Sequence, residues 1–133
     1  MSIVVIRAIL ETEVMTVKPL MQTSFENTLF VPTVGIPYQS ITLISGKVQN
    51  PTIGDDFHRE VGFLNLRLYY PIGNGSLDAA THAELLRSTF KRGATFAKDG
   101  ITVVIKGTPE LTFMTDVDRY VAILKIYFYA DIF

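Results

Sequence analysis

The sequence predicts an α+β domain of two layers, with two helices packed on a mostly antiparallel or mixed sheet of four to five strands. Residues 2–16 and 77–90 have apolar side chains at spacings of three and four, which is typical of a helix with one buried face. Residues 60–70 and 119–129 alternate with a period of two, which indicates strands. The order along the chain is therefore helix, strands, helix, strands.

The first helix is expected over residues 2–16. Its apolar stripe consists of Ile3, Ile6, Leu10, Val14 and Val17. Ser2 can act as the N-cap, and Lys18-Pro19 predicts the end, because the residue before a proline avoids helical geometry.

An irregular stretch follows over residues 19–37, with a short strand expected near residues 23–27. Residues 38–48 are predicted to be a strand in which Gln39, Ile41 and Leu43 share one face. The turn residues of segment 49–56 then predict a loop.

Residues 60–70 show the clearest alternation. One face consists of Leu64, Leu66, Leu68 and Tyr70, and the other of Phe63, Asn65, Arg67 and Tyr69. Because successive side chains of a strand point to opposite faces, the leucines are expected in the core.

The second helix is expected over residues 77–90, with Ser76 or Asp78 as its cap. Its apolar side consists of Ala79, Ala83, Leu86 and Phe90. His82 is expected on the polar side, in contact with solvent. Lys91-Arg92-Gly93 predicts the end of this helix.

The remaining chain is predicted to be β. Asp99-Gly100, a hairpin turn dipeptide, leads into a short strand over residues 101–105. Both faces of the long strand 119–129 are largely apolar, so it is expected to be central or covered on its second face. No repeat or linker interrupts the sequence, and residues 1–133 are expected to form a single domain.

Composition narrows the possible functions. The 133 residues carry a net charge of −1 and contain no cysteine, so disulfides and thiolate metal sites are impossible. A balanced charge provides no broad basic surface, and no nucleic-acid sequence recognition is expected. No apolar run approaches the roughly 18 residues of a membrane span, and the start lacks the features of a signal peptide. The chain is therefore expected to be cytosolic at synthesis.

Few residues suggest chemistry. Asp55, Asp56, His58 and Glu60 could bind a divalent metal, but Arg59 lies among them, and a solvated loop is the favoured interpretation. Segment 73–76 precedes a helix but lacks a phosphate-loop ending, so a turn and an N-cap explain it. No nucleophile motif occurs. We therefore expect no catalytic residues and no cofactor.

The outward faces of the two long strands suggest an interface instead. Phe63, Arg67 and Tyr69 share one such face, and Val121, Ile123, Tyr127 and Tyr129 share another. Aromatic side chains with an embedded arginine are typical of the cores of protein interfaces. The alternative is that the two helices cover these faces.

Several short motifs, in this order and spacing, resemble one protein family. They are Phe25-Glu26-Asn27, Phe30-x-Pro32, Gly35-x-Pro37-Tyr38, Asn50-Pro51-Thr52-x-Gly54, Arg59-Glu60-x-Gly62, Tyr70-Pro71-x-Gly73-x-Gly75, Phe90-x-Arg92-Gly93 and Tyr129-Ala130-Asp131-Ile132-Phe133. The family is that of the tail terminator-like proteins of long-tailed phages and prophages, and the resemblance covers nearly the whole chain.

The resemblance implies a structural α+β protein without catalysis or cofactor. Such proteins form a six-membered ring at the head-proximal end of the tail. The ring caps the tube, stops its polymerisation and offers a surface for head joining. The implied partners are further copies of the chain, the major tail tube protein and a head connector or completion protein. The implied location is the virion, after synthesis in the cytoplasm of the host bacterium.

Two groups of residues are the candidates for ring or tube contacts. One is the strand face with Phe63, Arg67 and Tyr69, and the other is the loop residues Asp55, Asp56, His58 and Arg59. Three alternatives remain open: a neck or head-completion protein, an unrelated α+β module that binds a small molecule, and a metal-dependent enzyme centred on His58.

Overall fold

The structure, a computed structural model, describes residues 2–17, 21–32, 35–50, 57–73, 75–116 and 118–133. Two helices lie in this part of the chain, α1 (Ser2–Thr16) and α2 (Leu77–Thr89). The strands are β1 (Gln22–Ser24), β2 (Tyr38–Ser45), β3 (His58–Pro71), β4 (Thr95–Lys98), β5 (Ile101–Ile105), β6 (Glu110–Asp116) and β7 (Arg119–Ile132).

One mixed sheet contains the seven strands of the described residues: six follow the order β1-β2-β3-β7-β5-β4, and β6 pairs with β7 beside this path. β1 runs parallel to β2, and the other pairs are antiparallel. β7 is bordered by β3 on one side, whereas β6 and β5 share its other side. β6 pairs with residues 119–125 of β7, and β5 pairs with residues 128–130. The expected central position of β7 is confirmed.

The expected count of four to five strands is wrong, because β4 and β6 were not predicted. β4 has only four residues, and only Phe96 among them is a large apolar side chain. In β6, Phe113 and Met114 are adjacent and both exposed, so the strand has no alternating pattern. Edge strands that bury little side-chain surface leave only a weak signal in the sequence.

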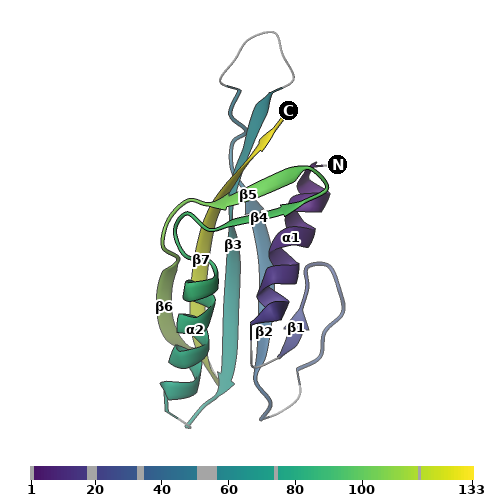
Figure 1. The fold of residues 1–133 in the computed structure, drawn as a ribbon. Helices are drawn as coiled ribbons and strands as arrows, with labels where there is room; N and C mark the ends of the chain where they lie inside the picture. Colours follow the sequence, from purple (N-terminus) through teal and green to yellow (C-terminus); the bar gives the residue numbers. More distant parts are fainter. Residues whose placement is uncertain (1, 18–20, 33–34, 51–56, 74, 117) are drawn as a thin grey trace.

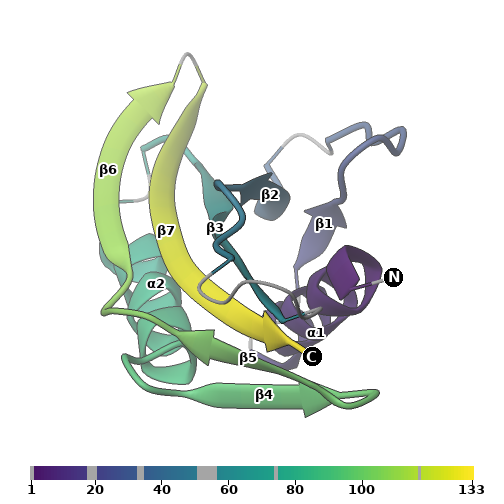
Figure 2. The same cartoon turned by 90° about the horizontal axis from the view of Figure 1, so that it is seen from above.

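Both helices lie on the same side of the sheet, which curls around them (Figures 1 and 2). α2 contacts β3 and β7, whereas α1 contacts the β4–β5 hairpin. This hairpin crosses in front of the helices because β7 bends toward it (Figure 2). The opposite side of β2, β3 and β7 carries no helix of the described chain.

The core lies between the helices and the sheet, and it confirms the predicted register of β3. Leu64, Leu66 and Leu68 are fully buried. Their neighbours from β7 are Ala122, Leu124, Ile126 and Phe128, and from the helices Ile6, Leu10, Ala83 and Leu86, all nearly inaccessible. Burial of each large side chain contributes about 1.5–3 kcal/mol relative to exposure.

Asp99, Gly100 and Gly62 each occupy a position with a specific backbone requirement. Asp99 and Gly100 have φ angles of 52° and 78°, the left-handed geometry of the tight turn between β4 and β5. Gly62 on β3 has no room for a Cβ atom, which would overlap the carbonyl oxygen of Ile44 on β2. The glycine therefore permits the close approach of these two strands.

His82 corrects a prediction. It is 2% exposed and packs inside the molecule, whereas the sequence predicted a solvated position. Tyr70 Oη lies 3.1 Å from His82 Nδ1. His82 is three residues after Ala79 and four before Leu86, so it belongs to the buried stripe of α2. Ser76 occupies the N-cap position as predicted, although its side chain makes no capping hydrogen bond.

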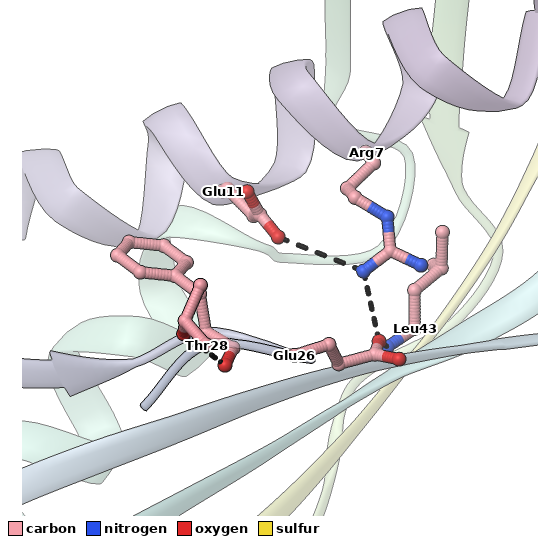
Figure 3. A network of polar contacts seen from close by, with 6 residues as sticks. Arg7, Glu11, Glu26, Thr28 and Leu43 are labelled. Carbon is pink, nitrogen blue, oxygen red and sulfur yellow. Dashed lines mark hydrogen bonds and ion pairs between the residues drawn. The ribbon is translucent and has the colours of Figure 1, made fainter. Parts of the chain in front are cut away.

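Glu26, from the motif Phe25-Glu26-Asn27, secures the edge of β2 (Figure 3). β1 pairs with residues 38–40 of β2, and the next part of that edge has no strand neighbour among the residues that the structure describes. The Leu43 amide instead donates a hydrogen bond to Glu26 Oε1, which also accepts one from Arg7 of α1 at 2.8 Å. Burial raises the pKa of Glu26, but these two hydrogen bonds outweigh it and hold that pKa below its usual value.

Candidate assembly interface

The helix-free side of β2, β3 and β7 brings the two outward faces predicted from the sequence into one surface, which we call the outer face. Its members are Tyr38, Ser40, Thr42 and Ile44 of β2, Val61, Phe63, Asn65, Arg67 and Tyr69 of β3, and Val121, Ile123, Lys125, Tyr127 and Tyr129 of β7. Val121 has the register of this face but is only 2% exposed, so it does not contribute to the surface as predicted. The antiparallel register places Phe63 opposite Tyr127 and Arg67 opposite Ile123. The alternative that the helices cover this face is wrong.

Aromatic rings lie at both ends of the outer face. Phe63 and Tyr127 have ring centroids 5.2 Å apart, with Ile44 beside them around a hollow of about 220 Å³. At the other end, the rings of Tyr38 and Tyr69 are stacked, with centroids 4.5 Å apart. Burial and the neighbouring Tyr69 raise the pKa of Tyr38. Rings in such arrangements are rigid and half-buried, which reduces the entropy lost on binding.

Two cations and one unsatisfied acceptor lie between these aromatic ends. Arg67 is exposed and makes no hydrogen bond or ion pair with any described residue. Lys125 Nζ lies 5.7 Å from the centroid of the Phe63 ring. Asn65 Oδ1 is buried without a hydrogen-bond partner in the described chain. The centre of the outer face therefore offers positive charge to a partner, whereas the Asn65 acceptor lies beneath its surface.

Arg59 belongs to an extension in which the start of β3 and the end of β7 project beyond the helices (Figure 1). Arg59 Nε and Nη2 donate to the two carboxylate oxygens of Asp131 at 2.6 and 3.0 Å, and these bonds raise the pKa of Arg59. Its guanidinium carbon lies 4.3 Å from the centroid of the Tyr129 ring. A bidentate pair of this kind orients the arginine side chain.

His58 lies next in this extension, with its Nε2 3.3 Å from Glu60 Oε1. On the strand, His58 and Arg59 point to opposite faces. Asp55 and Asp56 lie outside the described residues. Of the seven predicted contact residues, the structure therefore brings Phe63, Arg67 and Tyr69 onto one face, with Arg59 further along the same strand.

Sequence reasoning missed Tyr38, Asn65 and Lys125 as candidates. Asn65 and Lys125 were placed on outward faces, but only the pairing of β3 with β7 shows that they are neighbours. Tyr38 gave no signal of its own, since its position depends on the pairing of β2 with β3. Cross-strand neighbours of this kind come from distant parts of the sequence.

Metal sites and membrane spans are two further features that the described residues can be compared with. In the described part of the chain, no three His, Asp or Glu side chains are grouped in a way that could hold a metal ion. None of the helices described is long and apolar enough to cross a membrane.

Comparisons with known proteins bear on the fold and on the family of this chain. A solved structure that is 20% identical in sequence superposes with a TM-score of 0.75, covering 96% of this chain and 94% of that chain, which shows a shared fold. A comparison with curated protein sequences finds no match. The family model for the phage tail terminator protein matches residues 5–123. The resemblance seen in the sequence is thereby confirmed, and the chain belongs to the phage tail terminator family.

Proposed function

We propose that this protein is the terminator of a phage tail: a six-membered ring that caps the tail tube, ends its polymerisation and provides the surface for head joining. The family match over residues 5–123 supports a structural role in the tail and a place in the virion. The single observation that carries the contact model is the outer face, a side of the sheet that neither helix covers (Figure 2).

The assembly requires two kinds of contact. A tube that grows by stacking identical rings uses a heterologous contact that does not close along its axis. Within the terminator ring the contact is also heterologous, but it closes. The terminator therefore needs one surface that matches the last tube ring and a different surface toward the head.

The outer face has the composition of such a contact. Half-buried rings and an arginine are enriched in interface cores, where they contribute much of the binding energy. Arg67 has no intramolecular partner among the described residues, so a carboxylate of a neighbouring subunit can pair with it.

The extension with His58 and Arg59 is the second proposed contact. Arg59 is held by Asp131 and Tyr129, so the extension presents an oriented surface. Loop residues Asp55 and Asp56 remain part of this proposal. We assign the extension and the outer face to ring and tube contacts together, each burying on the order of 1,000 Å² or more in total.

The proposed partners are other copies of the chain, the major tail tube protein and the head connector or completion protein. The protein is made in the cytoplasm of the host bacterium, from a phage or prophage genome, before it joins the particle. The proposed role is structural and requires no catalytic residue and no cofactor.

Tail lengths in phage that lack this chain test the proposal. Negative-stain electron microscopy should show tails longer than the normal uniform length, and the natural chain supplied in trans should restore that length. Tails of normal length that fail to join heads would instead indicate a neck or head-completion protein. Normal, joined particles would refute the proposal.

A further inference from the structure

A pocket of about 510 Å³ opens between the first turns of α2 and the segments that precede β1 and β2. Its apolar walls are Met21, Ile36, Pro37 and Leu77. The volume falls within the roughly 300–1,000 Å³ that is common for small-molecule sites. We call it the His82 pocket, after the buried residue that lines it.

The polar residues that line this pocket are Gln22, Tyr70, Asp78, Thr81 and His82, and a hydrogen bond holds two of them in place. Tyr70 and His82 are 8% and 2% exposed, and their hydrogen bond links β3 to α2. Asp78, one helical turn before His82, also lines the pocket, and its charge is close enough to raise the pKa of Tyr70 together with burial. Oriented polar groups beside apolar walls are the usual composition of a ligand site.

The Tyr70–His82 hydrogen bond bears on which imidazole nitrogen of His82 can donate a hydrogen bond to a ligand. Burial lowers the pKa of His82, so the imidazole is neutral at neutral pH and carries one proton. The buried hydroxyl of Tyr70 needs an acceptor, and Nδ1 is the atom at 3.1 Å. In the tautomer in which Tyr70 donates to Nδ1, the proton of His82 lies on Nε2, which has no partner among the described residues.

We infer that the His82 pocket binds an apolar group that ends in a hydroxyl, the chemistry of a phenol. The apolar walls hold the ring, His82 Nε2–H donates to the hydroxyl oxygen, and the hydroxyl hydrogen bonds to the Asp78 carboxylate. This inference does not depend on the proposed role in the tail.

Other ligand classes fit the pocket less well. An anion would be repelled by the Asp78 carboxylate, and a cation would meet a neutral imidazole that presents a proton. A purely apolar ligand would remove water from Nε2–H without replacing its hydrogen bond. A hydroxyl, which both donates and accepts, matches the Asp78 and His82 pair.

Titration of the full chain with p-cresol and toluene, followed by amide NMR shifts, tests the inference. p-Cresol should shift the signals of Ile36, Leu77 and His82 and saturate. Toluene, which lacks the hydroxyl and both of its hydrogen bonds, should bind at least about tenfold more weakly. Equal affinity for the two probes, or no shift at these residues, would overturn the inference.

Variants locate the site and the donor. His82→Phe should reduce the preference for p-cresol over toluene to the part that the Asp78 hydrogen bond supplies, and an undiminished preference would overturn the role of His82. Leu77→Arg, at a 75% exposed position at the mouth, should abolish the shifts. Leu85→Arg, on an exposed part of the same helix, is the control and should leave them unchanged. If His82→Phe does not fold, the affinities of the natural chain for p-cresol and toluene still test whether the pocket recognises the hydroxyl.

The phenol could come from a partner protein or from a free small molecule, and N-acetyltyrosinamide distinguishes these sources. Binding at least as tight as that of p-cresol would support a tyrosine presented on a polypeptide. Binding more than tenfold weaker would support a free phenol, because the flanking amides would then not fit.

Discussion

Phe63 of β3 and Tyr127 of β7 are direct neighbours on adjacent strands, with ring centroids 5.2 Å apart, on the side of the sheet that carries no helix. Each residue belongs to a strand whose opposite face is in the core. The contact therefore joins the outward faces of both long strands into one aromatic surface. Such a surface is the expected feature of a protein that functions by assembling with others.

The leucine face of β3 supplies the first prediction. Leu66 is fully buried, so Leu66→Ala should lower the free energy of unfolding by about 2–5 kcal/mol, as large-to-small core substitutions do. Chemical denaturation measures this change. Leu29→Ala, at a position that is 97% exposed, is the matched control and should change stability little. Equal effects of the two substitutions would contradict the register of β3.

The interaction of Glu26 with β2 supplies the second prediction. Glu26→Ala removes the acceptor of the Leu43 amide and of Arg7. Because a polar group is then left unsatisfied at the sheet edge, stability should fall by about 1–3 kcal/mol in denaturation experiments.

Glu84→Ala is the control for this prediction. It removes an exposed helical pair, Glu84 with Arg87, and should cost less than about 0.5 kcal/mol. A loss for Glu26→Ala as small as that for Glu84→Ala would mean that Glu26 does not hold the edge of β2.

The buried imidazole of His82 supplies a prediction on pH. Burial lowers the pKa of His82 in the folded state from its usual value of 6.5. The folded protein then binds fewer protons than the unfolded chain. His82 thus contributes stability that is present above pH 6.5 and lost as the pH falls through the folded-state pKa.

Thermal melts between pH 7.5 and 5 (about the range in which a histidine titrates) measure this effect. In His82→Asn, which keeps an acceptor for Tyr70 but does not titrate, the decrease in melting temperature toward acid should be smaller. His58→Asn leaves His82 in place and should retain the full decrease. The same pH dependence in the natural chain and in His82→Asn would exclude the buried histidine as its cause.

The sequence was informative where one periodicity covered a long segment. α1 begins and ends as predicted, at Ser2 and Thr16, and β3 extends the predicted 60–70 segment by two residues at its start and one at its end. Because apolar side chains are buried along one side of these elements, their spacing in the sequence predicts both the type of element and the side that packs in the core. The family resemblance was also available from the sequence, because it rests on turn and glycine positions rather than on burial.

The parts that could not be predicted depend on tertiary context. β4 and β6 are edge strands with mostly exposed side chains, so their sequences lack the alternation of apolar and polar residues that a buried face requires. The neighbours of Arg67 were hidden because they come from β2 and β7, far away in the sequence. His82 was misplaced because its polarity was given more weight than its helical spacing to Ala79 and Leu86.

The central claim is that the outer face makes a contact on which tail assembly depends, and tail length in particles with Arg67→Glu tests it most directly. Arg67 is exposed, so the variant should fold normally, but a reversed charge at a buried contact typically costs about 3–5 kcal/mol. Lys98→Glu makes the same change of charge on β4, away from the outer face, and is the control. In negative-stain micrographs, Arg67→Glu should give overlong tails or tails without heads, while Lys98→Glu particles should look normal. Normal tail length and normal infectivity with folded Arg67→Glu protein would contradict the account.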